Sequence, residues 1–130
     1  MTSLSTAQAE VVFEKSEYLN FERGLERYAG NEGTYTGILR FYSLIIPALI
    51  EAIRGIDYDC LPEMANKFHG LRLAGRSICA KGIESRAEAL EKAARSGNTD
   101  YINTYCDAFL GDLWYLVFEI NEILARKGND

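Results

Sequence analysis

The sequence predicts an all-α protein, an up-and-down antiparallel four-helix bundle with one or two short extra helices on its N-terminal side. Apolar residues recur at helical spacing along nearly all of the 130 residues, and no stretch alternates as a strand would. Only two prolines occur, whereas Ala, Leu, Glu and Ile are abundant. Long amphipathic segments joined by short connections pack as antiparallel neighbours. We therefore expect a single domain over residues 1–130.

Two short helices are expected before the bundle. Residues 4–14 are weakly amphipathic and are expected to form an accessory helix or a frayed end. A second helix is expected over about 18–28, where Gly30 and Asn31 end it.

The first bundle helix is expected over 32–54. Pro47 lies inside it and has no backbone N–H to donate, so we expect a bend there rather than a break. Gly55 stands where a C-terminal cap belongs. The apolar stripe of this helix comprises Tyr35, Ile38, Leu39, Tyr42, Ile45, Ile46, Leu49 and Ile53.

The second bundle helix is expected over 60–81. Asp59 can cap it, Pro62 is tolerated because it falls in the first turn, and Gly82 closes the helix. Its apolar stripe comprises Leu61, Met64, Phe68, Leu71, Gly75 and Ile78.

The third bundle helix is expected over 85–96. Residues 85–88, Ser-Arg-Ala-Glu, have the capping-box pattern, and Gly97 stops the helix. Two ion pairs at i,i+4 spacing support it, Glu88–Lys92 and Glu91–Arg95.

The fourth bundle helix is expected over 99–127, with Asn98 or Thr99 as its cap. Its apolar stripe comprises Ile102, Tyr105, Phe109, Leu113, Leu116, Val117, Ile120 and Leu124. The core predicted from the four bundle helices comprises Tyr35, Leu39, Ile46, Leu49, Phe68, Leu71, Ile78, Leu90, Phe109, Leu113, Leu116 and Ile120.

Charge and composition exclude several classes of partner. The formal net charge is −5, which argues against nucleic acid and against an anionic membrane surface, since both need a basic face. The longest unbroken apolar run, 44–50, is too short to span a bilayer. Residues 1–5 lack the features of a secretory signal, so we expect a cytoplasmic protein, and we expect it to be a monomer.

Three widely spaced cysteines, Cys60, Cys79 and Cys106, are expected to be reduced and largely buried. No CxxC pair occurs, so the cysteines give no support to a zinc or redox site.

His69 is the only histidine. Bundles that hold metal need several inward ligands, often as Glu-x-x-His, and the residue three before His69 is Asn66. No Ser or Cys can be assigned to His69 as a nucleophile. At about 100° per residue, His69 points roughly 130° away from the apolar stripe of its helix, so we expect it to be exposed. A solvated surface histidine without a function stays open.

The helix neighbours of His69 suggest an anion site. Arg72, Leu73 and Arg76 follow within two turns, and Asn66 lies one turn before. Two guanidinium groups beside an exposed imidazole suit a phosphoryl group, because arginine pairs well with phosphoryl oxygens. Arginines that merely solvate the outer face are an equally good interpretation of the spacing.

Several motifs resemble those of the histidine-containing phosphotransfer (HPt) domain family, and together they cover about residues 21–124. The family pattern Gly-Leu-x-Arg-Phe/Tyr-x-Gly-Asn-x-x-x-Tyr reads GLERYAGNEGTY at 24–35, and its Leu-x-x-Phe pattern resembles ILRFY at 38–42. The family's His-x-Leu-Lys-Gly reads HGLRL at 69–73. A Leu-Glu pair before a turn with small residues, Arg and Gly reads LEKAARSG at 90–97.

The resemblance implies a phosphorelay carrier, which is not an enzyme in its own right. His69 would accept a phosphoryl group from the aspartyl phosphate of a response-regulator receiver domain, or of a hybrid sensor kinase, and pass it to another receiver. Such carriers hold no nucleotide, metal or other cofactor, because the receiver supplies Mg²⁺. Arg72 replaces the family's Lys and keeps its charge. Arg76, Asn66 and Leu73 would complete the phosphoryl and docking surface.

The chain departs from the family pattern at three positions. Leu73 stands in place of a Gly that keeps the helix surface low, Phe68 in place of a small residue, and Cys79 in place of a second Gly. Leu73 therefore keeps open an alternative function, a degenerate HPt-like bundle that docks a receiver or kinase without phosphotransfer. An unrelated helical interaction protein is the third interpretation.

Overall fold

The structure, a computed structural model, describes residues 18–128, so the helix expected over 4–14 lies outside the described residues. Within this range the protein is all-helical, as the sequence predicts. The elements are α2 (Phe21–Arg27), α3 (Glu32–Arg54), the 3₁₀ turn η1 (Tyr58–Cys60), α4 (Leu61–Ile78), α5 (Lys81–Ser96) and α6 (Thr99–Gly128).

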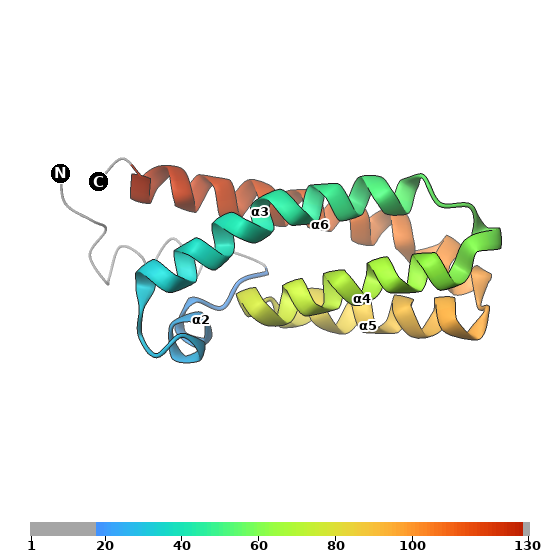
Figure 1. Cartoon of the computed structure of the whole chain (residues 1–130), viewed down its shortest axis with the longest axis horizontal. Helices are drawn as coiled ribbons and strands as arrows, with labels where there is room; N and C mark the ends of the chain where they lie inside the picture. The colour runs from blue at the N-terminus through green and yellow to red at the C-terminus, as the bar shows by residue number, and fades with distance from the viewer. Residues whose placement is uncertain (1–17, 129–130) are drawn as a thin grey trace.

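The long helices form a bundle (Figure 1). Helix α3 contacts α4 and α6, and α5 also contacts α4 and α6, so each long helix lies against two others. The short helix α2 contacts α3 and lies at the end of the bundle where α4 ends and α5 begins (Figure 1).

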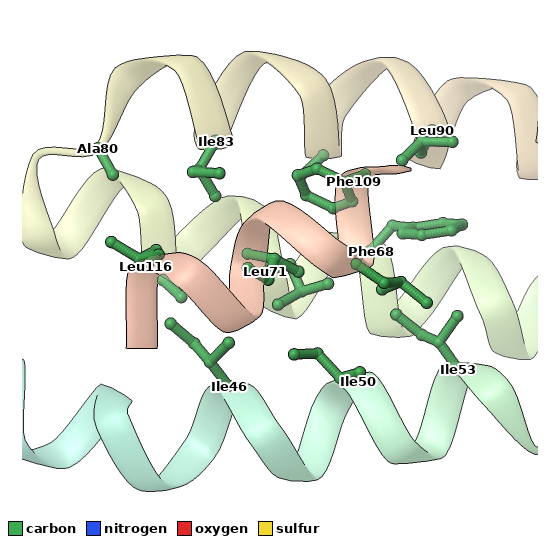
Figure 2. Close-up of a cluster of buried hydrophobic side chains, with 14 of the residues drawn as sticks. Ile46, Ile50, Ile53, Phe68, Leu71, Ala80, Ile83, Leu90, Phe109 and Leu116 are labelled. Atoms are coloured by element: carbon green, nitrogen blue, oxygen red, sulfur yellow. The ribbon is translucent and has the colours of Figure 1, made fainter. Parts of the chain in front are cut away.

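The core lies between the long helices (Figure 2). Every residue predicted for the core is buried except Leu49, which is partly buried and packs against the core. The helical period therefore identified most of the inward face of the long helices, but Tyr105, predicted on the stripe of the last helix, is 52% exposed.

Several predicted caps are confirmed. The Asn98 side chain accepts a hydrogen bond from the backbone N–H of Tyr101 at 3.1 Å, and Gly97 ends α5 with a φ of 76°. Gly55 is the C-cap of α3, and the helix continues through Pro47. Both predicted ion pairs of α5 form, Glu88–Lys92 at 3.4 Å and Glu91–Arg95 at 2.9 Å.

Residues 24–35, which run from α2 into the first turn of α3, have clear structural roles. A Cβ added at Gly24 would collide with the ring of Tyr35, so glycine lets that ring enter the core. Gly30 has a φ of 76°, which favours glycine, and the Asn31 side chain caps α3 by accepting from the backbone N–H of Thr34 at 2.9 Å. The Tyr35 hydroxyl donates to the carbonyl of Ile78 at 2.7 Å, so this segment ties α3 to the end of α4.

The predicted junction between the second and third bundle helices is wrong. Helix α4 ends at Ile78 and α5 begins at Lys81, one turn before the expected start, so neither the stop at Gly82 nor the capping box at 85–88 exists. Burial explains the difference, because Ala80 and Ile83 are both buried in the core and extend α5 backwards. Cys79 makes the turn in the left-handed region, at a φ of 62°.

The predicted cap of α4 is also wrong. Asp59 lies inside η1, and Cys60 is the N-cap without a side-chain hydrogen bond. Pro62 does fall in the first turn, as expected.

By length and composition alone, α3 could cross a membrane. The expectation that no segment is long enough to span a membrane was based only on the unbroken apolar run 44–50. A membrane-spanning helix also tolerates a few polar residues among its apolar ones. The core helix of a soluble protein meets the same criteria, and α3 buries an apolar stripe against α4 and α6.

Candidate functional site

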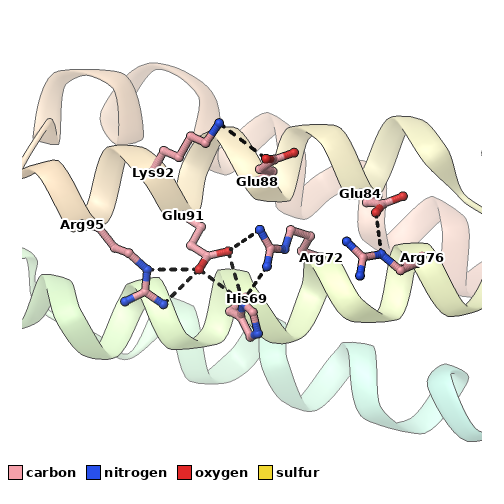
Figure 3. A network of polar contacts seen from close by, with 8 residues as sticks. All are labelled: His69, Arg72, Arg76, Glu84, Glu88, Glu91, Lys92 and Arg95. Atoms are coloured by element: carbon pink, nitrogen blue, oxygen red, sulfur yellow. Dashed lines mark hydrogen bonds and ion pairs between the residues drawn. The ribbon is translucent and has the colours of Figure 1, made fainter.

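The site is formed where α4 and α5 pack closely together (Figure 3). Gly75 permits this approach, since a Cβ there would lie 2.8 Å from the backbone nitrogen of Glu84. Two turns before Gly75 on α4, His69 lies beside Glu91 of α5. The His69 side chain is 40% exposed and that of Glu91 only 9% exposed, so the ring is accessible while its partner is not.

Glu91 is the centre of the polar network. Its carboxylate accepts two hydrogen bonds from Arg95, at 2.9 and 3.1 Å, and lies 3.6 Å from Arg72. Burial raises the pKa of the Glu91 carboxyl, but the hydrogen bonds from Arg95 and His69 and the charge of Arg72 outweigh burial and hold that pKa below its ordinary value. Glu91 is therefore a carboxylate at neutral pH.

This carboxylate determines which nitrogen of His69 is free. Nδ1 lies 3.2 and 3.3 Å from the two oxygens of Glu91 and 3.2 Å from a terminal nitrogen of Arg72. A carboxylate only accepts and a guanidinium only donates, so Nδ1 serves one of them at a time. Because Glu91 offers two oxygens and Arg72 can pair with Glu91 instead, we assign the proton to Nδ1. The neutral ring then carries its lone pair on Nε2, which makes no hydrogen bond to any of residues 18–128.

Of the two arginines predicted for the site, the structure brings only Arg72 to the imidazole. Arg72 approaches from the Nδ1 side, and its Nε is buried without a hydrogen-bond partner among the described residues. Arg76 instead donates to Glu84 of α5 at 2.9 Å.

Asn66 and Leu73 lie on the outer surface of α4. Both are exposed, Leu73 to 40%, and neither makes a hydrogen bond to His69 within the part of the chain that the structure describes. They lie one helical turn before and one turn after His69 and do not position its ring.

The described residues contain no group of three or more His, Cys, Asp or Glu side chains that could hold a metal ion. All three cysteines are free, and the expectation that they are largely buried is correct only for Cys106. Cys60 is exposed and Cys79 is partly exposed, because they occupy the two ends of α4 rather than its core face.

The position of Glu91 against His69 was not predicted from the sequence, where Glu91 was expected only as the ion-pair partner of Arg95. A signal was present, because Glu91 falls at helical spacing between the buried residues Ala87 and Ala94. A carboxylate in an apolar stripe needs a charged or hydrogen-bonding partner from a neighbouring helix.

Comparison of the chain with family models, with curated proteins and with solved structures found no match.

Proposed function

We propose that the protein is a phosphorelay carrier of the HPt type that accepts a phosphoryl group on Nε2 of His69. The observation that carries this proposal is the contact between His69 and Glu91, which fixes a half-exposed imidazole with its free lone pair on Nε2. A solvated surface histidine needs no buried carboxylate at its other nitrogen. Such a carrier acts stoichiometrically in the cytoplasm as a single domain and a monomer, without a nucleotide or metal site of its own.

The architecture that we propose is an up-and-down antiparallel four-helix bundle of α3, α4, α5 and α6. Residues near the start of α3 contact the end of α4, as the bond from Tyr35 to Ile78 illustrates. Further along α3, the side chain of Leu49 faces Gly70, nearer the middle of α4. These contacts favour opposite directions for α3 and α4, and the two-residue turn between α4 and α5 favours the same for that pair.

Individual residues of the HPt-like motifs have structural roles that agree with the resemblance. The pattern at 24–35 begins with Gly24, whose missing side chain admits the ring of Tyr35, and the pattern ends with Tyr35 itself. Cys79 stands where the family has a Gly, and its φ of 62° is one that glycine adopts without strain. These fits support the likeness in fold, while the network around His69 supports phosphotransfer.

The transfer step follows from the tautomer. The Nε2 lone pair of His69 attacks the phosphorus atom of an aspartyl phosphate on the receiver, and the P–O bond to the aspartate breaks as the N–P bond forms. The aspartate leaves as a carboxylate. The Nδ1 proton stays on the ring, which therefore gains one positive charge and lies 3.2 Å from the carboxylate of Glu91.

Glu91 thus has two roles, both exerted through His69. It fixes the ring and its tautomer before transfer, and it stabilises the positive charge that develops on the ring during transfer. Arg95 and Arg72 keep Glu91 ionised and in place. On this proposal Arg72 acts first through Glu91, and pairs with the phosphoryl group only if its guanidinium turns toward Nε2.

The docking surface that we propose is the outer face of α4 around His69, with the adjacent face of α3. The exposed side chains of Asn66 and Leu73 would meet the receiver directly. No nucleic acid and no membrane are part of this proposal.

The experiment is phosphorylation of the full chain by phosphoramidate and by a phosphorylated receiver, read out by intact mass. We expect the gain of one phosphoryl group that is lost in acid, and no gain in the His69→Gln variant. Long-range ¹H–¹⁵N NMR on the wild type reads the proton position directly, and a proton on Nε2 would contradict the mechanism even if some phosphate were incorporated.

One observation favours a second candidate, the degenerate module that docks without transfer. Leu73, one turn from His69, is 40% exposed where the resembled family has a Gly, so its side chain stands beside the imidazole that a receiver must reach. Receiver binding without phosphorylation in the wild type, together with phosphorylation of the Leu73→Gly variant, would establish this candidate.

A further inference from the structure

A basic pocket lies at the end of the bundle, between α2 and the turn that joins α4 to α5. Its volume is about 510 Å³, within the range of small-molecule sites. Four cationic side chains line it: Arg23 and Arg27 from α2, Arg76 from α4 and Lys81 from α5. Among the lining residues that the structure describes, Glu84 is the only carboxylate.

Three of these four cations have no ion-pair partner among the residues that the structure describes. Glu84 pairs with Arg76 at 2.9 Å. Within residues 18–128, the side chains of Arg23, Arg27 and Lys81 form no ion pair. Such a concentration of positive charge is unexpected in a chain with a net charge of −5.

The two arginines of α2 are four residues apart, so their side chains lie on the same face of a helix of only seven residues. Like charges at this spacing repel each other and destabilise a helix. An anion in the pocket would remove this repulsion and would join α2 to α4 and α5 through one ligand.

The start of α5 adds donors of the right kind to the cationic pocket. Ala80 is the N-cap and provides no side-chain bond to the first turn of this 16-residue helix. Gly82 lines the pocket, and a Cβ added there would meet nothing within 4 Å, so the backbone is open to a ligand. Free N–H groups at a helix start favour negative charge, in addition to the four side chains.

We propose that this pocket binds a small dianionic phosphate, either inorganic phosphate or the phosphate group of a phosphomonoester. The planar guanidinium groups of Arg23, Arg27 and Arg76 suit the tetrahedral oxygens of phosphate through paired hydrogen bonds. The site is distinct from His69, which is seven residues before Arg76 on α4 and pairs with a different residue of α5. The inference does not depend on phosphotransfer at His69.

The first test titrates the full chain with inorganic phosphate and with glycerol 3-phosphate, followed by ¹H–¹⁵N NMR at constant ionic strength. We expect saturable shifts of the backbone amides of Lys81 and Gly82 with phosphate and no saturable shifts with chloride. Tighter binding of glycerol 3-phosphate than of inorganic phosphate would identify a phosphomonoester as the ligand, and equal or weaker binding would identify free phosphate.

Matched variants test which cations carry the binding. The double variant Arg23→Gln/Arg27→Gln should weaken phosphate binding about tenfold or more, since each charge-assisted contact contributes more than a neutral one. The control Arg40→Gln/Arg54→Gln removes the same charge from exposed positions of α3 and should bind like the wild type. If the glutamine variant of α2 unfolds, the variant Arg23→Lys/Arg27→Lys keeps the charge but loses the fork geometry and should still bind more weakly than wild type.

Cys79 provides a second, independent readout because it lines the pocket and its thiol is partly exposed. Saturating phosphate should slow alkylation of Cys79 by the neutral reagent iodoacetamide by about tenfold. Cys60, exposed at the other end of α4, is the internal control and should react at an unchanged rate.

Two results would overturn the proposal. The first is the absence of saturable binding, or equal binding by the Arg23→Gln/Arg27→Gln variant. The second is loss of binding in the His69→Gln variant, which would place phosphate at the other site.

Discussion

Replacement of Glu91 by glutamine tests the central contact of the candidate site. The substitution keeps the shape of the side chain and removes the negative charge that faces Nδ1 of His69 at 3.2 Å. An amide can also donate to Nδ1, so the variant no longer fixes the proton on that atom.

The expected size of the effect on transfer follows from the geometry. Two unit charges about 4 Å apart interact by about 4 kcal/mol at an effective dielectric constant near 20. The His69 ring is 40% exposed, so solvent screens much of this energy. We expect a loss of about 1.5 kcal/mol of transition-state stabilisation, which is about a tenfold slower phosphotransfer.

The same variant has a predicted pH signature in stability. The pKa of Glu91 lies below its ordinary value of 4.5 in the folded protein, so the unfolded chain binds its proton first as the pH falls. The stability that this carboxylate contributes is therefore present above about pH 4.5 and is lost as the pH falls through the folded pKa. Urea unfolding at pH 7 should show a loss of about 1 kcal/mol for Glu91→Gln, and the difference from wild type should shrink as the pH falls below 4.5.

Glu88→Gln is the matched control, since Glu88 lies on the same helix and forms an exposed ion pair with Lys92 at 3.4 Å. It should leave transfer unchanged and cost little stability. Glu91→Gln with the transfer rate and the Nδ1 proton of the wild type would refute the role assigned to Glu91.

Further predictions concern the core, the arginine beside the histidine and the turn after α4. Leu71→Ala should cost about 2–5 kcal/mol of unfolding free energy in urea titrations, because Leu71 is fully buried; a cost below about 0.5 kcal/mol would place it outside the core. Arg72→Ala should slow transfer or shorten the lifetime of phosphohistidine in a mass-spectrometric time course, whereas Arg76→Ala should have a smaller effect; equal rates for Arg72→Ala and wild type would remove Arg72 from the site. Cys79→Gly should raise the unfolding free energy by about 0.5–1 kcal/mol, since glycine adopts the φ of 62° without strain, and a lower midpoint in thermal melts would contradict this.

Helix periodicity and end signals predicted most of the fold. The bounds of α3 agree with the predicted ones, because Asn31 and Gly55 mark both ends locally. The α4–α5 junction was not predictable in the same way. Its left-handed residue is Cys79 rather than glycine, and the carbonyls of Ser77 and Ile78 accept hydrogen bonds from residues distant in the chain.

Only the part of the candidate site that α4 contributes could be predicted from the sequence. Helix arithmetic indicated the exposure of His69, because that needs only the apolar stripe of its own helix. The contact between Glu91 and His69 depends on the register between α4 and α5, which is fixed by packing around Gly75 and Ile83. The pairing of Arg76 with Glu84 depends on the same register. Spacing along α4 alone therefore predicted Arg76 too near the imidazole of His69.

The end of α4 also restricts where the protein can be engineered. Three successive carbonyls accept hydrogen bonds from upstream residues: Ser77 from the hydroxyl of Tyr28 at 2.6 Å, Ile78 from that of Tyr35 at 2.7 Å, and Cys79 from the backbone N–H of Asn20 at 3.2 Å. A fluorescent label or affinity tag inserted between α4 and α5 would pull these acceptors away from their donors. The connection at 55–57, at the opposite end of α4, has no such bonds from distant residues within 18–128 and is the place to attach a reporter of receiver docking.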